Sequence, residues 1–161
     1  MRENPLLIRA LMQAFRLTGL ALEWDECLAP IIEAFLARGT LADHRWLWSG
    51  DGRITAGHLA VLAERAAAGP LQLILFDGVI GADWSWSQQD EAMAERLLAA
   101  CPPGTRTLAV AGGYHTPATP IEMGVPMGAW LAGSGPVSGT SRSATAAGVS
   151  TIASHGSSIA A

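Results

Sequence analysis

Three side chains suited to acid–base or metal chemistry each follow an apolar segment of the chain. Glu23 ends a short apolar run, Asp77 directly follows the run Leu71–Phe76, and His115 comes after a third run that closes on two glycines. A carboxylate can orient an imidazole or share a metal ion with it, and histidine titrates near neutral pH. The three residues could therefore serve proton transfer or metal binding, if the fold brings them together.

The elements that must position these residues are predicted by apolar runs alternating with amphipathic segments. We expect strands near residues 19–24, 71–76 and 107–112, separated by helices of ten or more residues. This order predicts an α/β fold, a layered parallel-sheet core with flanking helices. Ligand sites of such sheets lie beyond the carboxyl ends of the strands. We therefore expect the Glu23, Asp77 and His115 side chains to lie within roughly 10 Å of one another, close enough to act together.

A structural interpretation of the same residues stays open beside this one. Glu23 and Asp77 could cap neighbouring helices, and His115 could make only a hydrogen bond within a turn. The position of the histidine separates the two interpretations. If His115 points away from Glu23, the functional interpretation loses its basis.

Capping patterns predict where several helices begin. Asn4-Pro5 starts a helix near the amino terminus, Thr55 caps one that ends at Gly69-Pro70, and Ser87–Asp90 has the pattern of a capping box. A parallel α/β sheet would normally begin with a strand, whereas this sequence begins with a helix. We therefore expect an amino-terminal strand to be missing from the sheet, which would leave an exposed edge suited to self-association.

Two tryptophans lie in the loop after Asp77. Trp84 and Trp86 alternate there and could line a pocket for a flat or apolar ligand, or simply cover the core. Both alternatives remain open from the sequence.

Composition limits the classes of partner. The net charge is −4, and the ten basic residues, all arginines, are scattered singly, which argues against a nucleic-acid partner. No apolar run approaches the length of a membrane span and no signal-peptide core is evident, so we expect no membrane association and a cytoplasmic location. The cysteines, Cys27 and Cys101, are predicted to be buried free thiols.

The chain divides into an α/β domain over residues 1–132 and a low-complexity tail over 133–161. Of the 29 tail residues, 22 are Gly, Ala, Ser or Thr, which cannot bury enough apolar surface to fold, so the tail is predicted to be disordered.

A resemblance to a known family rests on the order of several short motifs. They are Glu23 at a strand end, Asp51-Gly52-Arg53, Gln89–Met93 opening a helix, and Ala111–Thr116 after a strand. In this order, over about residues 2 to 132, the chain resembles the erythromycin esterase, ChaN and Tiki superfamily. The resemblance implies an α/β fold with its site at the strand ends. Members include lactone-hydrolysing esterases, haem-iron-binding lipoproteins and metal-dependent proteases.

The resemblance also implies roles for individual residues. His115 and Glu23 would be active-site residues and ligands of a divalent metal, while Arg53 joins Trp84 and Trp86 as a candidate for binding a cofactor such as haem. The family's opening motif, a strand ending in Gly-Glu-x-His, is absent from the sequence.

Three hypotheses about function follow. The first is a hydrolase-like domain in which water attacks an ester, lactone or amide of a small-molecule substrate. His115, Glu23 and Asp77 would be its catalytic residues, and the reaction could proceed with or without a metal ion. The second is a haem- or metal-binding module without catalysis. The third is a truncated, inactive relative of the hydrolases, because loss of one acid or base group typically removes about 10² to 10⁴ in rate.

Overall fold

A computed structural model of the chain describes residues 4–48, 54–78, 83–101, 105–133 and 149–154. The elements follow one another in this order: α1 (Pro5–Ala14), β1 (Gly19–Asp25), η1 (Glu26–Leu28), α2 (Ala29–Arg38), η2 (Arg45–Trp48), α3 (Ala56–Ala68), β2 (Gln72–Asp77), α4 (Trp86–Ala100), β3 (Thr107–Gly112), α5 (Met127–Leu131) and β4 (Val149–Ser154). Here η denotes a short 3₁₀ helix.

The strands form one parallel sheet in the order β2-β1-β3-β4. The prediction of an α/β fold with a parallel sheet is confirmed, and each of the three expected strands lies within one residue of its predicted bounds. Because β1 pairs with both β2 and β3, the carboxyl ends of these three strands meet at one edge of the sheet. Strand β2 lies at one side of the sheet, and self-association through such an edge stays a prediction.

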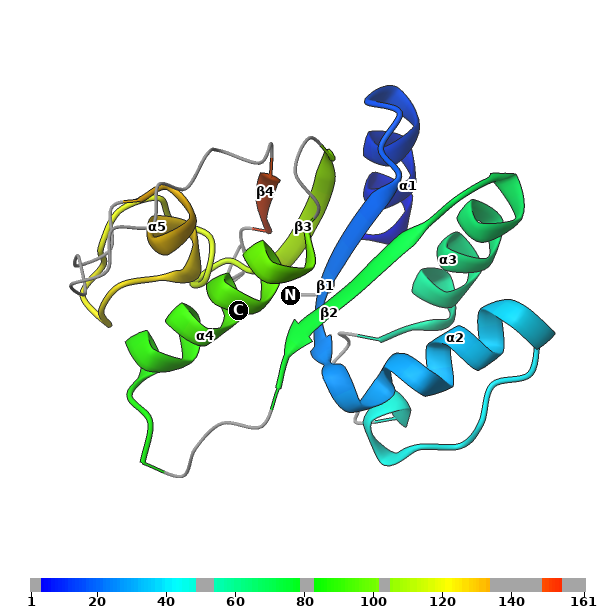
Figure 1. Cartoon of the computed structure of the whole chain (residues 1–161), viewed down its shortest axis with the longest axis horizontal. Helices are drawn as coiled ribbons and strands as arrows, with labels where there is room; N and C mark the ends of the chain where they lie inside the picture. The colour runs from blue at the N-terminus through cyan, green and yellow to red at the C-terminus, as the bar shows by residue number, and fades with distance from the viewer. Residues whose placement is uncertain (1–3, 49–53, 79–82, 102–104, 134–148, 155–161) are drawn as a thin grey trace, which may run out of the picture.

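Helices cover both faces of the sheet, with α1, α2 and α3 on one side and α4 and α5 on the other (Figure 1). The alternation of strand side chains decides which face each residue serves. On β1, Leu20, Leu22 and Trp24 belong to the core cluster under α1–α3, whereas Ala21 belongs to the cluster under α4. On β3, Ala109 and Ala111 also face α4. Small side chains at these positions let α4 pack close to the strands.

The amino-terminal helix begins where the sequence predicts it. The Asn4 side chain accepts a hydrogen bond from the Leu6 N–H at 3.0 Å, and Pro5 occupies the first helical position. Ile8 and Met12 are the buried residues of α1, so this helix is held to the sheet by one apolar face.

The N-cap of helix α4 lies two residues before the start of the predicted capping box. Its N-cap is Ser85, whose side chain accepts from the Gln88 N–H, while Gln88 Oε1 accepts from the Ser85 N–H at 2.8 Å. The Ser-x-x-Gln pattern supplies both halves of this exchange. The predicted box at Ser87–Asp90 is wrong, because Ser87 accepts instead from the Val125 N–H and Asp90 serves two other segments.

The tail differs in part from the predicted disorder. Its described residues from 149 to 154 form β4, which pairs in parallel with all six residues of β3. Val149, Thr151 and Ile152 are β-branched residues, which favour strands. Residues 134–148 and 155–161 lie outside the described part of the chain.

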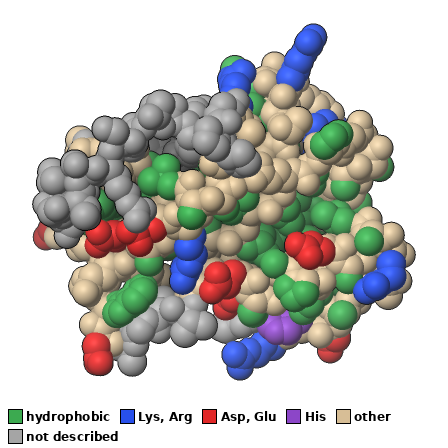
Figure 2. All heavy atoms as spheres, viewed as in Figure 1, with side chains coloured by type: hydrophobic (Ala, Val, Ile, Leu, Met, Phe, Trp, Pro, Cys, Tyr) green, Lys and Arg blue, Asp and Glu red, His purple; other side chains and the backbone are tan. Residues whose placement is uncertain are grey.

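Arginine side chains are scattered over the face seen in Figure 2 rather than gathered into a stripe. Among the described residues, no helix combines the length and the apolar character needed to cross a membrane.

Candidate functional site

The end of β1 places Glu23 on the α4 side of the sheet. Glu23 follows Ala21 by two residues and so shares its face, and its side chain is nearly buried, with 8% of the residue exposed. Pairing with β2 shifts register between Leu22 and Asp25, an irregularity of the kind that re-aims side chains next to functional sites. Glu23 Oε2 accepts a hydrogen bond from the Gly112 N–H at 2.5 Å, which ties the ends of β1 and β3 together.

His115 follows the end of β3 in a turn held by backbone hydrogen bonds. The His115 N–H donates to the Gly112 carbonyl at 3.0 Å, and the His115 carbonyl accepts from the Gly128 N–H at 2.8 Å. Gly128 allows this approach, because an added Cβ there would collide with the carbonyl oxygen of Thr116. These hydrogen bonds therefore fix the backbone at His115 independently of the contacts that its side chain makes.

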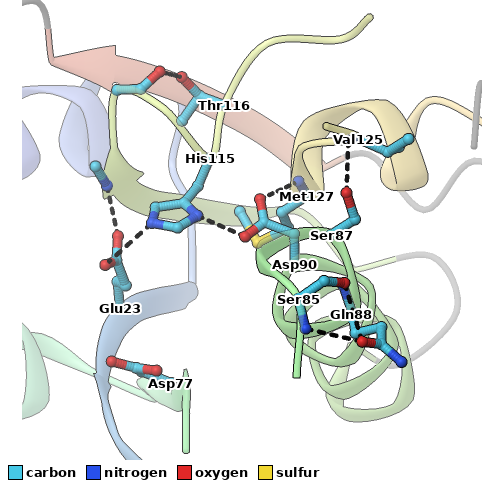
Figure 3. Close-up of polar contacts among 12 residues, drawn as sticks. Glu23, Asp77, Ser85, Ser87, Gln88, Asp90, His115, Thr116, Val125 and Met127 are labelled. Carbon is cyan, nitrogen blue, oxygen red and sulfur yellow. Dashed lines mark hydrogen bonds and ion pairs between the residues drawn. The ribbon is translucent and has the colours of Figure 1, made fainter. Parts of the chain in front are cut away.

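A third acidic residue, Asp90 of α4, completes the site. Asp90 Oδ1 lies 2.8 Å from His115 Nδ1, and Oδ2 accepts from the Met127 N–H at 2.6 Å (Figure 3). Because an ionised carboxylate only accepts, Nδ1 carries the hydrogen in this pair. Asp90 is fully buried, so its two partners replace the water it has lost.

On its other side, the imidazole faces Glu23. His115 Nε2 lies 3.7 Å from Glu23 Oε1, beyond hydrogen-bond distance but within an ion pair. Figure 3 shows the imidazole between the two carboxylates, Glu23 from β1 and Asp90 from α4. The expected convergence of Glu23 and His115 is therefore present, and the interpretation that His115 only closes a turn does not describe its side chain.

Asp77 takes part at longer range. Its Oδ1 accepts from the Gly78 N–H at 2.9 Å, and at the end of β2 its register partner on β1 is Asp25. The contacts of the His115 ring go to Asp90, Glu23 and Trp86, whereas Asp77 acts on His115 through its charge.

The two tryptophans differ in their relation to the site. Trp86, the first residue of α4, stacks on His115 with ring centroids 5.6 Å apart and an angle of 21° between the rings. Trp84 is 45% exposed in the loop before the helix. Arg53, the third candidate for cofactor binding, lies outside the described residues.

The surroundings of His115 raise its pKa above the usual 6.5. Burial of the ring lowers the pKa, but the hydrogen bond to Asp90 raises it, as do the charges of Glu23, Asp90 and Asp77. The imidazolium form is thus favoured by three carboxylates from three elements of the fold.

The described residues do not assemble a metal centre. Glu23 and His115 were expected as tentative ligands, but no group of three or more His, Cys, Asp or Glu side chains in the described ranges is arranged to hold a metal ion. A haem iron on His115 Nε2 would also meet the Glu23 carboxylate, which already faces that nitrogen. The described residues therefore supply no third donor to the Glu23 and His115 pair for a metal ion, and the Glu23 carboxylate stands on the side of Nε2 from which a haem iron would bind.

The cysteines add no nucleophile to the site. Cys101 is buried and Cys27 is exposed, and both are free thiols, so the prediction of burial is wrong for Cys27. Cys27 lies in η1, just beyond the end of β1, where the chain leaves the sheet. A hydrogen bond to Asp25 raises the pKa of the Cys27 thiol to about 11, which leaves little thiolate at neutral pH.

Asp90 and the Trp86 stack are the functional features that sequence reasoning missed. A signal for Asp90 existed, because positions 90, 93, 94 and 97 form one helical stripe whose other members, Met93, Ala94 and Leu97, are apolar and buried. A carboxylate on the buried stripe of a helix needs a partner, and His115 was the available histidine. The stack had no comparable signal, since it depends on the exact start of α4.

Comparisons with known proteins leave the site to be interpreted from its own geometry. No family model matches the chain, and neither does any curated protein or solved structure.

Proposed function

We propose that the chain is a hydrolase-like domain in which His115 acts as a general base on water that attacks an ester, lactone or amide. One observation carries the proposal: the His115 imidazole is held between a fully buried carboxylate, Asp90, on Nδ1 and a second carboxylate, Glu23, facing Nε2. A histidine oriented by a buried carboxylate is an arrangement suited to general-base catalysis. The resemblance to the erythromycin esterase, ChaN and Tiki superfamily implies the same class of reaction.

The protonation states follow from the two contacts. In neutral His115 the hydrogen resides on Nδ1, where Asp90 accepts it, and the lone pair of Nε2 is directed toward the side of the ring that Glu23 faces. Nε2 takes a proton from the attacking water as the water oxygen bonds to the carbonyl carbon. The imidazolium then returns this proton to the leaving oxygen or nitrogen.

Glu23 serves the charged form of the histidine. Its Oε1 lies 3.7 Å from Nε2, so it stabilises the imidazolium without holding the nitrogen in a hydrogen bond that would block proton transfer. Its other oxygen is bound to the Gly112 N–H, which fixes the carboxylate relative to β3. Asp77 adds a further negative charge at longer range.

The test is turnover of a panel of small neutral substrates: an aryl ester, a lactone and an anilide. His115→Asn is the informative variant, because its amide can still donate to Asp90 while the base is lost. We expect the rate to fall by about 10² to 10⁴. The same change at His44, which takes no part in the His115 contacts, is the control and should leave turnover unchanged.

The competing hypotheses give other outcomes of the same experiment. Haem or metal binding without turnover would appear as an absorbance change on haem titration, or as a change in the His115 signals with added divalent metal. Absence of both turnover and binding would favour the inactive relative. Equal turnover in the wild type and His115→Asn would contradict the proposal.

A further inference from the structure

The stacked pair formed by Trp86 and His115 joins the first residue of α4 to the turn after β3. The two rings are nearly parallel, with an angle of 21° and centroids 5.6 Å apart. This contact lies within the range in which aromatic rings attract one another. It comes from the same helix that carries Asp90, four residues further on.

The hydrogen bond to Asp90 does not by itself fix the imidazole. It holds Nδ1, but small coupled changes in the two side-chain torsions of His115 can still tilt the ring about this hydrogen bond and shift Nε2 relative to Glu23. A flat surface against one face of the ring removes this freedom. We propose that Trp86 is a positioning residue, which holds the plane of the His115 ring so that Nε2 stays directed toward the Glu23 side of the site.

Trp86 is itself held by contacts at the start of α4. The capping box between Ser85 and Gln88 fixes the backbone on either side of it, with the Ser85 N–H donating to Gln88 Oε1 at 2.8 Å. Gly124 lies near the indole, since a Cβ added there would be 3.5 Å from Trp86 Cε3. The start of α4 therefore fixes the backbone from which the indole extends toward His115.

The charges facing His115 act on the ring but do not fix its plane. They are Glu23 from β1, Asp90 from α4 and Asp77 from β2, and all three favour the imidazolium. Trp86 adds an electron-rich face against the same ring, which also favours the positive form. A leucine at position 86 would still cover the imidazole but would lack the electron-rich face, so Trp86→Leu should lower the pKa of His115 and loosen its ring, whereas Trp86→Phe should preserve much of both effects.

The experiment compares Trp86→Leu and Trp86→Phe with the wild-type chain. Leu98→Ala is the control, because it removes an exposed apolar side chain from the same helix away from this contact. Nuclear magnetic resonance titration of His115 gives its pKa in each protein, and thermal melting shows that each is folded. We expect the pKa of His115 to fall by about half a unit or more in Trp86→Leu, and by less in Trp86→Phe. Leu98→Ala should titrate as the wild type does.

Turnover supplies a second readout, which rests on the proposed hydrolase function. Trp86→Leu should lower kcat by about 10- to 100-fold with little change in KM, and Trp86→Phe should recover most of the loss. If the wild type hydrolyses nothing, the hydrolase proposal fails and the titration still tests the positioning role. An unchanged kcat with a raised KM would instead make Trp86 a substrate surface and overturn the proposal.

A third measurement needs no destabilising variant. An imidazolium stacked on an indole quenches the indole fluorescence. The fluorescence of the wild type minus that of Trp86→Phe should therefore decrease on acidification, and the midpoint of this decrease should equal the pKa of His115. The inference would be overturned if Trp86→Leu is folded and its His115 has the same pKa as in the wild type. It would also be overturned if the fluorescence difference does not change over the pH range in which His115 titrates.

Discussion

Asp90 links His115 to the start of α5 through its two carboxylate oxygens. Oδ1 lies 2.8 Å from His115 Nδ1, 25 residues away in sequence, and Oδ2 accepts from the Met127 N–H at 2.6 Å, 37 residues away. The same buried group thus orients the proposed base and fastens the segment that follows it. Changes at Asp90 should consequently affect stability and activity in separable ways.

Asp90→Asn and Asp90→Ala should divide these two effects. Asn keeps an oxygen that can accept from the Met127 N–H. Ala instead leaves two donors without a partner, the buried Met127 N–H and the ring Nδ1–H of His115. We expect Ala to cost about 2 to 4 kcal/mol of unfolding free energy, and Asn clearly less. Urea unfolding of the two variants measures the difference. Equal stabilities would mean that the hydrogen bond to Met127 contributes little.

Stability should depend on pH through His115. Its folded pKa is raised above the unfolded value of 6.5, so the imidazolium contacts stabilise the fold below pH 6.5, and this contribution is lost as pH rises through the folded pKa. His115→Asn lacks the titration. The free energy of unfolding of wild type minus that of His115→Asn should therefore decrease from pH 6 toward pH 9, and a difference that grows with pH would have the wrong sign.

Close backbone packing around the site predicts opposite tolerances at two glycines. A Cβ at Gly128 would collide with the Thr116 carbonyl oxygen, whereas a Cβ at Gly112 would make ordinary contacts of 3.4 Å with Glu23 Oε2 and 3.5 Å with His115 Cδ2. We expect Gly128→Ala to lose about 1 to 3 kcal/mol of stability and Gly112→Ala to melt near the wild type. The melting temperatures of the two variants test this prediction. Similar melting temperatures would contradict it and would show that the contact between Gly128 and Thr116 can widen to admit a methyl group.

The sequence predicts the sheet better than it predicts the site. Apolar runs such as Leu73–Phe76 are decided locally, so the sequence predicts all three strands within a residue, and Glu23 and His115 follow from the ends of their strands. The sequence does not single out Asp90, because Ser87–Asp90 has the pattern of a capping box, a local role, whereas the partner of Asp90 lies 25 residues away. Strand β4 was missed for a related reason, because its pairing with β3 depends on an edge that the tail composition does not reveal.

The measurement closest to the central claim is the pH dependence of kcat/KM for hydrolysis of a neutral model ester, set beside the titration of His115 by nuclear magnetic resonance. Only neutral His115 can accept a proton, so kcat/KM should rise with pH along a limb whose pKa lies above 6.5 and equals that of His115 in the free protein. Asp90→Asn should lower the pKa from the kcat/KM profile and the pKa from the His115 titration by the same amount. In His115→Asn, the rise of kcat/KM with pH should be absent. Hydrolysis that is independent of the His115 titration, or that persists with the same profile in His115→Asn, would contradict the role of His115 as the base.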